Sequence, residues 1–253
     1  MIRWFALAGA LLVAACSAET PSAEAPRRGE ERQASTPPGP SEFVVLPCQD
    51  VAPGTPCALV MAGGKSLVFG APEGITGALA RAGVGQPDAV FLITLEGAGL
   101  EGLMRLRNTT WIGGRTSPLP VAGPEGSALA LAYLDKALEQ ADSLTYVQHQ
   151  PPGRFDSALF ATVDVKDGAP VTVFDTGDLN VIATGGKFGN AHYAVRYGGR
   201  LLALLGCPSP SENPFDGADP VIACETGNRM ENPWGVPAEG LWISRLGVTA
   251  GGP

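Results

Sequence analysis

Histidine is scarce in this sequence, because only His149 and His192 occur among 253 residues. Imidazole is the commonest metal ligand in proteins, so the chain cannot build a centre that uses more than two histidines. Basic residues are also in the minority, since 17 Lys and Arg face 25 Asp and Glu and leave a net charge of −8. Nucleic-acid binding depends on clustered cations that release counterions from phosphates. We therefore expect no nucleic-acid partner.

The chain also lacks a Gly-x-Ser-x-Gly turn, the element that exposes a serine nucleophile at the end of a buried strand. A serine hydrolase therefore has no support in the sequence. What is present is an ordinary globular composition, with 45% hydrophobic and 17% charged residues. A chain of this length can bury one sizeable core. We expect one main domain.

The N-terminus has the layout of a secretory signal. A positive Arg3 precedes an apolar run, Trp4 to Val13, which is too short to span a bilayer as a permanent helix. The tetrapeptide Val13-Ala14-Ala15-Cys16 resembles the lipobox of bacterial lipoproteins. That resemblance implies that residues 1–15 are a signal peptide and that Cys16 is lipidated.

Residue Ser17 follows the lipidated cysteine, and in lipoproteins this implies sorting to the outer membrane, facing the periplasm. The protein would then contact the membrane through its lipid anchor. A plain signal peptide with a chance cysteine is the alternative. Residues 16–42 contain almost no large apolar side chain, so we expect a disordered tether there, followed by a folded domain over residues 43–253.

Short apolar runs separated by glycine-rich turns dominate the domain. They predict an α/β arrangement of sheets covered by helices. Helices are expected over residues 74–83, 100–106 and 127–141, the last with Leu129, Leu131, Leu134 and Leu138 on its apolar face. Strands are expected over residues 42–47, 57–62, 66–69, 89–93, 119–122, 171–174, 179–182, 192–197, 200–205, 219–224 and 240–244.

The order of these elements, with the turns Gly70-Ala71-Pro72-Glu73-Gly74 and Gly123-Pro124-Glu125-Gly126, resembles the metallo-β-lactamase fold superfamily. The branch is that of ribonuclease Z and hydroxyacylglutathione hydrolase. The likeness runs from about Phe43 to Gly247, nearly the whole domain. It implies a four-layer αββα sandwich with a metal site at one edge, between the sheets.

The metal ligands of that family are missing at the positions that the resemblance aligns. Its motif of histidines and aspartate falls on Thr94, Glu96, Ala98 and Gly99, and its remaining ligands fall on Phe188, Cys207 and Arg245. Gly70 stands where the family has an aspartate that supports the ligands. The resemblance thus implies a domain without a metal cofactor, in which binding of an unidentified protein or small molecule, or scaffolding, replaces hydrolysis.

A rearranged site is the alternative. Glu96, His192 and a reduced Cys207 could together provide three ligands for zinc, which would keep the protein a metal-dependent hydrolase. His192 is four residues from the expected ligand position, on a predicted strand. A lone histidine on a strand is far more often structural.

Four cysteines remain besides Cys16, an even number that predicts two disulfides in an exported protein. They are Cys48, Cys57, Cys207 and Cys224, and three pairings are possible. Pairing Cys48 with Cys57 and Cys207 with Cys224 closes the shortest loops. Because the resemblance places Cys207 where the family has its bridging aspartate, a Cys207–Cys224 bond would join loops that a metal otherwise holds.

Overall fold

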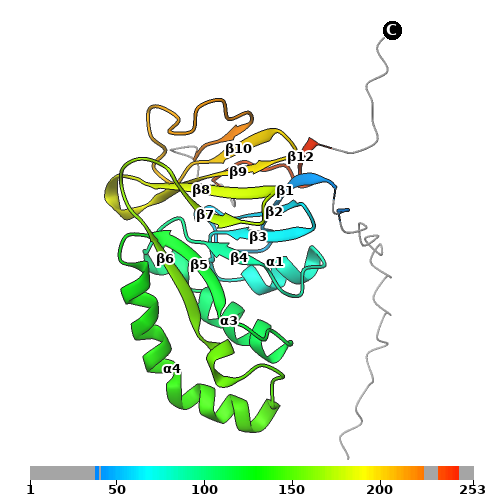
Figure 1. Ribbon diagram of the computed structural model, residues 1–253, viewed down its shortest axis with the longest axis vertical. Coiled ribbons are helices and arrows are strands. Elements are labelled where there is room, and N and C mark those ends of the chain that lie inside the picture. Colours follow the sequence, from blue (N-terminus) through cyan, green and yellow to red (C-terminus); the bar gives the residue numbers. More distant parts are fainter. Residues whose placement is uncertain (1–37, 40, 225–232, 245–253) are drawn as a thin grey trace, which may run out of the picture. The chain divides into compact units, whose positions relative to one another are not determined.

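Two mixed β-sheets form the domain in the computed structural model, which describes residues 38–39, 41–224 and 233–244. The larger sheet has the strand order β12-β1-β2-β3-β4-β5-β6, and the smaller one has the order β11-β10-β9-β8-β7 (Figure 1). The larger sheet comprises β1 (Phe43–Pro47), β2 (Ala58–Ala62), β3 (Lys65–Phe69), β4 (Ala89–Phe91), β5 (Leu119–Pro124), β6 (Phe160–Val165) and β12 (Leu241–Ser244). The smaller sheet comprises β7 (Val171–Asp175), β8 (Leu179–Gly185), β9 (Ala191–Tyr197), β10 (Arg200–Leu204) and β11 (Val221–Ile222). The α/β class predicted from the sequence is confirmed.

Turn chemistry accounts for the antiparallel part of each sheet. β2 and β3 form a hairpin around Gly63-Gly64, and β9 and β10 form one around Gly198-Gly199. Two glycines favour the tight two-residue turn that such hairpins need. Strands β3, β4, β5 and β6 are parallel to one another. Parallel neighbours need a crossover, and helices supply it. Both glycine-pair hairpins were expected from the sequence.

The helices lie on one side of the larger sheet. They are α1 (Ile75–Arg81), α2 (Gly97–Leu100), α3 (Leu103–Ile112) and α4 (Ser127–His149), with short 3-10 turns η1 (Phe155–Ala158) and η2 (Lys187–Gly189). Ile75 and Leu79 of α1 and Leu103 and Leu106 of α3 join the core on this side of the sheet. A second core lies between the two sheets. There the Tyr193 hydroxyl, on β9, donates hydrogen bonds to the backbone oxygens of Leu92 (2.6 Å) and Ala122 (3.2 Å), and so joins the sheets.

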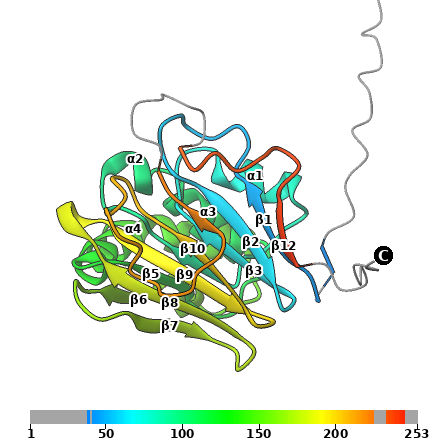
Figure 2. The same ribbon diagram turned by 90° about the horizontal axis from the view of Figure 1, so that it is seen from above.

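The outer face of the smaller sheet differs from the four-layer expectation. Within the described ranges no helix covers it; the segment around Phe215 and Ala218 packs there instead. Seen from above, β8, β9 and β10 lie over the larger sheet with that segment on the near side (Figure 2). Ala194 and Ala203 face this segment. Their small side chains leave a shallow surface that a loop can cover.

Three details depart from the sequence expectation. The last predicted helix, expected to end at residue 141, continues to His149. Leu129 is 62% exposed, whereas Leu131 of the same predicted face is buried. β6 was not expected at all. None of the helices in the described part is long and apolar enough to cross a membrane.

Candidate functional site

The edge where the resemblance places a metal site forms where β4 and β9 run past each other. After β4 the chain continues through Ile93, whose backbone oxygen accepts a hydrogen bond from the Ala191 N–H (2.9 Å). Thr94 then forms an isolated bridge with Asn190. The end of β10 reaches the same place, where the backbone N–H of Gly206 meets His192. Three of the predicted segments therefore meet at one edge.

The four positions after β4 offer little to a metal ion. The hydroxyl of Thr94 accepts a hydrogen bond from the backbone N–H of Glu96 (3.1 Å), and Glu96 lies exposed at the start of α2. Ala98 is exposed and has no donor atom. A Cβ at Gly99 would lie 2.6 Å from Cγ2 of Thr94. The backbone turn is preserved, but the Thr94 methyl takes the space that a side chain at position 99 would need.

Gly70 is excluded from carrying the supporting aspartate for a backbone reason. Its φ is +79°, and a Cβ there would come within 3.0 Å of the Pro56 carbonyl oxygen. Pro56 belongs to the loop that the Cys48–Cys57 disulfide closes, with a Cα–Cα distance of 5.5 Å. The Cys57 sulfur also lies 3.9 Å from the backbone oxygen of Gly70. The disulfide loop therefore covers the position from which an acid would support metal ligands.

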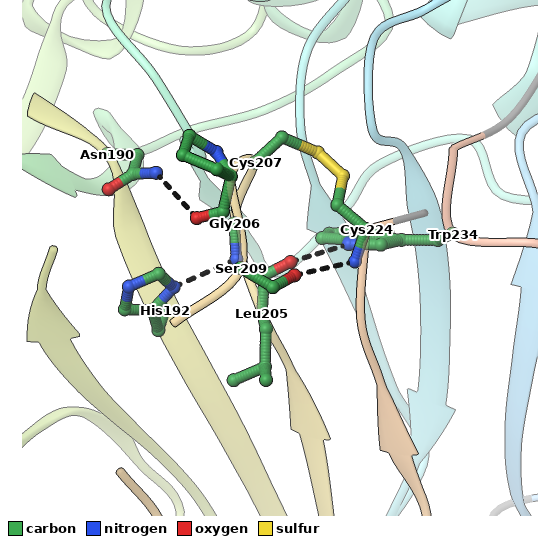
Figure 3. The surroundings of a disulfide bond; sticks show 9 residues. Asn190, His192, Leu205, Gly206, Cys207, Ser209, Cys224 and Trp234 are labelled. Carbon is green, nitrogen blue, oxygen red and sulfur yellow. Dashed lines mark hydrogen bonds between the residues drawn. A yellow bond between two sulfur atoms is a disulfide. The ribbon is translucent and has the colours of Figure 1, made fainter. Parts of the chain in front are cut away.

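His192 is a structural residue of β9. Its side chain is 4% exposed, and its Nδ1 accepts a hydrogen bond from the Gly206 N–H (2.9 Å; Figure 3). Burial lowers the pKa of His192 below its ordinary value, and the nearby charge of Asp167 opposes that shift. With Nδ1 accepting, the proton of the neutral ring is on Nε2. Gly206 itself leaves no room for a side chain, since a Cβ would lie 2.6 Å from the Ala191 oxygen.

Cys207 and Cys224 form a disulfide with a Cα–Cα distance of 5.3 Å, and Cys48 pairs with Cys57; of the three pairings that the sequence leaves open, this is the one that closes the shortest loops. Figure 3 shows this bond beside His192 and Trp234. The Cys224 N–H donates to the Ser209 hydroxyl (2.7 Å), and the Trp234 indole N–H donates to the Leu205 oxygen (2.8 Å). The ends of β10 and β11 are thereby joined covalently and by hydrogen bonds.

The three-ligand site of Glu96, His192 and a reduced Cys207 does not form. No three His, Cys, Asp or Glu side chains gather into a possible metal site anywhere in the described residues. The sulfur of Cys207 is bound to Cys224, and Nδ1 of His192 is bound to the backbone. The donor set present at this edge does not fit a zinc ion, which needs at least three protein ligands.

Some predicted positions fall outside what the structure describes. They are Cys16 with the signal and most of the tether, Arg245, and the side chain of Phe188, of which only the backbone in η2 is described.

A cavity of about 550 Å³ that the sequence did not point to lies beside α1 and α3. Its lining includes two carboxylates and two guanidiniums, those of Asp50, Glu73, Arg81 and Arg105. Arg81 pairs with Asp50 (3.3 Å) and donates to the backbone oxygen of Gln49. The side chains of Glu73 and Arg105 make no ion pair or hydrogen bond with the described residues. No local motif signals this cavity, since its residues come from three separate segments.

A buried cluster of charged side chains, which no local sequence pattern predicts, lies between α3 and α4. Arg107 of α3 is 1% exposed and donates to both oxygens of Asp142 (2.9 and 2.6 Å) and to Asp135 (3.1 Å). Burial, and then the charge of Arg107, lowers the pKa of Arg115 to about 10. Burial raises the pKa of Asp135. These contacts fasten α4 to α3, which is a structural role.

Comparison with known proteins gives likenesses of fold. No protein-family model and no curated protein matches the sequence. Human tRNase Z, short form, is 16% identical with a TM-score of 0.48, over 66% of this chain and 70% of that one. The metallo-β-lactamase fold protein YhfI from Bacillus subtilis is 16% identical with a TM-score of 0.41, over 64% of this chain and 61% of that one. Zn²⁺-bound PqqB from Methylobacterium extorquens is 16% identical with a TM-score of 0.36, and the match spans half of its length. These structures are similar to this chain in fold at low identity, and the one from Bacillus subtilis is described as a metallo-β-lactamase fold protein.

Proposed function

We propose that this chain is a lipid-anchored protein of the bacterial cell envelope whose metallo-β-lactamase-like domain binds or scaffolds a partner and does not hydrolyse substrates through metal ions. One observation carries the proposal. At the candidate edge the hydroxyl of Thr94 accepts a backbone hydrogen bond, His192 accepts one at Nδ1 and so carries its proton on Nε2, and the sulfur of Cys207 is in a disulfide. The exposed carboxylate of Glu96 is therefore left without the two further ligands that a zinc site needs.

A metal hydrolase of this kind needs an ion that lowers the pKa of a bound water and an open coordination position for that water. Here the edge is filled. Thr94 packs against Gly99, the Ala191 oxygen packs against Gly206, and the Cys207–Cys224 disulfide spans the gap between β10 and β11. The disulfide and these close backbone contacts hold together segments that metal-coordinating side chains would otherwise connect. The fold therefore does not need a metal ion for its stability.

Metal analysis of the mature protein tests this directly. The protein is purified without chelators, dialysed against zinc, manganese or iron, and measured for bound metal. We expect less than one ion per chain, and no change on His192→Ala substitution. Stoichiometric bound metal in the wild-type protein that is lost in His192→Ala would contradict the proposal. His149→Ala is the matched control, because it removes the only other histidine of the sequence.

The location rests on the lipobox-like Cys16 and on Ser17, which imply an outer-membrane lipoprotein facing the periplasm. Expression of the full chain in a bacterial host, followed by separation of inner and outer membranes, tests it. We expect the wild-type chain in the outer-membrane fraction and a Cys16→Ala chain unlipidated. Equal lipid labelling of the two chains would exclude this anchor.

We expect a small-molecule partner to bind in the cavity beside α1. Glu73 and Arg105 both line it, and their side chains form no ion pair with each other. A ligand that carries both a carboxylate and an ammonium group could pair with both side chains. A thermal-shift screen with dipeptides tests this, since a ligand that binds only the folded state raises the melting temperature. Arg105→Gln should abolish the shift, and Arg154→Gln, which changes an exposed arginine that does not line the cavity, should retain it. No shift with any dipeptide would leave a protein partner as the candidate.

A further inference from the structure

The outward face of α4 carries large apolar side chains that nothing in the described part of the chain covers. Leu129 is 62% exposed, Tyr133 69%, Leu144 63% and Val147 73%. At 100° per residue these four positions fall within one narrow stripe of the helix. The opposite side of α4 faces the domain with buried Leu131 and Asp142, among others. The helix therefore has two apolar faces, one of which is open to solvent.

This open face belongs to a helix that is held firmly. Asp164 of β6 accepts hydrogen bonds from the backbone N–H groups of Ala128 (2.7 Å) and Gly126 (3.2 Å) at the start of α4. The buried ion pair between Arg107 and Asp142 fastens the second half. Figure 1 shows α4 running beside β6, outside the sheet. A surface fixed in this way loses little conformational entropy when it binds.

The apolar residues of the stripe are spaced almost symmetrically about the middle of the helix, so their order is the same from either end. Leu129 and Val147 lie nine residues before and after Leu138, and Tyr133 and Leu144 lie five before and six after it. In an antiparallel pair of identical helices that cross at the level of Leu138, whose own side chain faces the domain, Leu129 of one copy would therefore lie near Val147 of the other, and Tyr133 near Leu144. Such a self-complementary patch is what a two-fold symmetric interface requires.

Two charges near the middle of the helix, one on the stripe and one beside it, favour the same arrangement. Lys136 and Glu139 are exposed and lie near the centre of the helix, where they pair with each other within one chain. Antiparallel packing would bring Lys136 of one copy beside Glu139 of the other, twice by symmetry. A parallel pair would set lysine against lysine. We propose that two copies of this chain associate through antiparallel packing of their α4 helices about a two-fold axis near Leu138.

A lipid surface fits this face less well. Helices that lie on membranes carry several Lys or Arg residues that attract anionic lipid. Lys136 is the one charged side chain of α4 that falls within this stripe, Glu139 lies beside it, and the whole chain has a net charge of −8. Two packed helix faces make an interface at the small end of the known range, so we expect a dimer that dissociates on dilution.

Disulfide trapping tests the geometry on the full chain in bacterial membranes. Ala137 is exposed and lies next to the proposed axis, so Ala137→Cys should form a linked homodimer on a non-reducing gel. Leu129→Cys alone should not, because its two copies would lie at opposite ends of the interface. Leu129→Cys mixed with Val147→Cys should give a linked heterodimer. Linkage of Leu129→Cys with itself, or none for Ala137→Cys, would overturn the proposal.

Sedimentation of the detergent-solubilised full chain tests the energetics. The wild-type chain should shift from monomer to dimer with rising concentration, and Leu144→Glu should weaken association by at least about tenfold, because it places a carboxylate in an apolar contact. Val171→Glu is the matched control, since Val171 is similarly exposed at 49% but lies on β7. A monomeric wild-type chain at every concentration would refute the dimer. So would a Leu144→Glu chain that dimerises normally but loses binding to lipid vesicles.

Discussion

Two glycines with the same backbone angle allow the close packing at the candidate site to be measured. Gly70 and Gly54 both have φ of +79°, a conformation that disfavours any residue with a Cβ. At Gly54 no atom lies within 4 Å of the added Cβ, whereas at Gly70 the Pro56 oxygen lies inside 3.0 Å. Gly54→Ala should therefore cost only the backbone penalty, about 1 kcal/mol. Gly70→Ala should cost a further ~1–3 kcal/mol for overpacking.

Urea unfolding under non-reducing conditions, with both disulfides intact, measures the two free energies of unfolding on the same scale. Because the φ penalty is common to both variants, their difference isolates the contact between position 70 and Pro56. Gly70→Asp, which restores the acid that the metallo-β-lactamase resemblance implies, should be at least as destabilised as Gly70→Ala. Equal stability of Gly70→Ala and Gly54→Ala, or a stable Gly70→Asp chain that gains metal, would refute the view that the disulfide loop has displaced a ligand-supporting residue.

Three further predictions follow from buried groups. Asp142→Asn removes one of the two carboxylates that pair with the buried Arg107 and leaves Asp135 as the other, so it should lower the free energy of unfolding by roughly 1–3 kcal/mol in urea titrations. The pKa of His192 is lowered by burial, so the unfolded chain binds the proton more readily, and the free energy of unfolding should fall as pH drops below 6.5. His192→Gln should reduce this fall in urea titrations at several pH values, and His149→Gln should leave it as in the wild type. Replacing the Cys207–Cys224 pair by serines should lower the free energy of unfolding by roughly 3 kcal/mol, as expected for a loop of this length.

Local sequence patterns predicted most of the secondary structure for identifiable reasons. The pair Gly63-Gly64 between two apolar runs allows a tight turn with few alternatives, so the β2–β3 hairpin was predictable. The run from Ala89 to Ile93 is apolar throughout because β4 is buried on both faces, against helices and against the other sheet. These features depend on neighbours in the sequence, and that is why they could be read from it.

α4 shows where local patterns failed. Leu131, Leu134 and Leu138 share one face at helical spacing, but Leu129 lies 200° from Leu131 and is 62% exposed, so assigning it to the same face was wrong. What the spacing of leucines did not show is the polar part of that face, where Arg107 of another helix pairs with Asp142 and Asp135. A contact between residues 35 positions apart in the chain leaves no periodic trace in the sequence.

At the candidate site, residue identities alone determined what chemistry is missing. Ala98 and Gly99 bind no metal through a side chain in any fold, and four cysteines in an exported chain predict disulfides. Only the tertiary structure decided what replaces the missing ligands, because the close approach of Pro56 to Gly70, the bond from Gly206 to His192 and the Cys207–Cys224 disulfide all join segments distant in sequence. Composition limits which atoms can react, whereas the packing of the two sheets decides which of those atoms are already engaged.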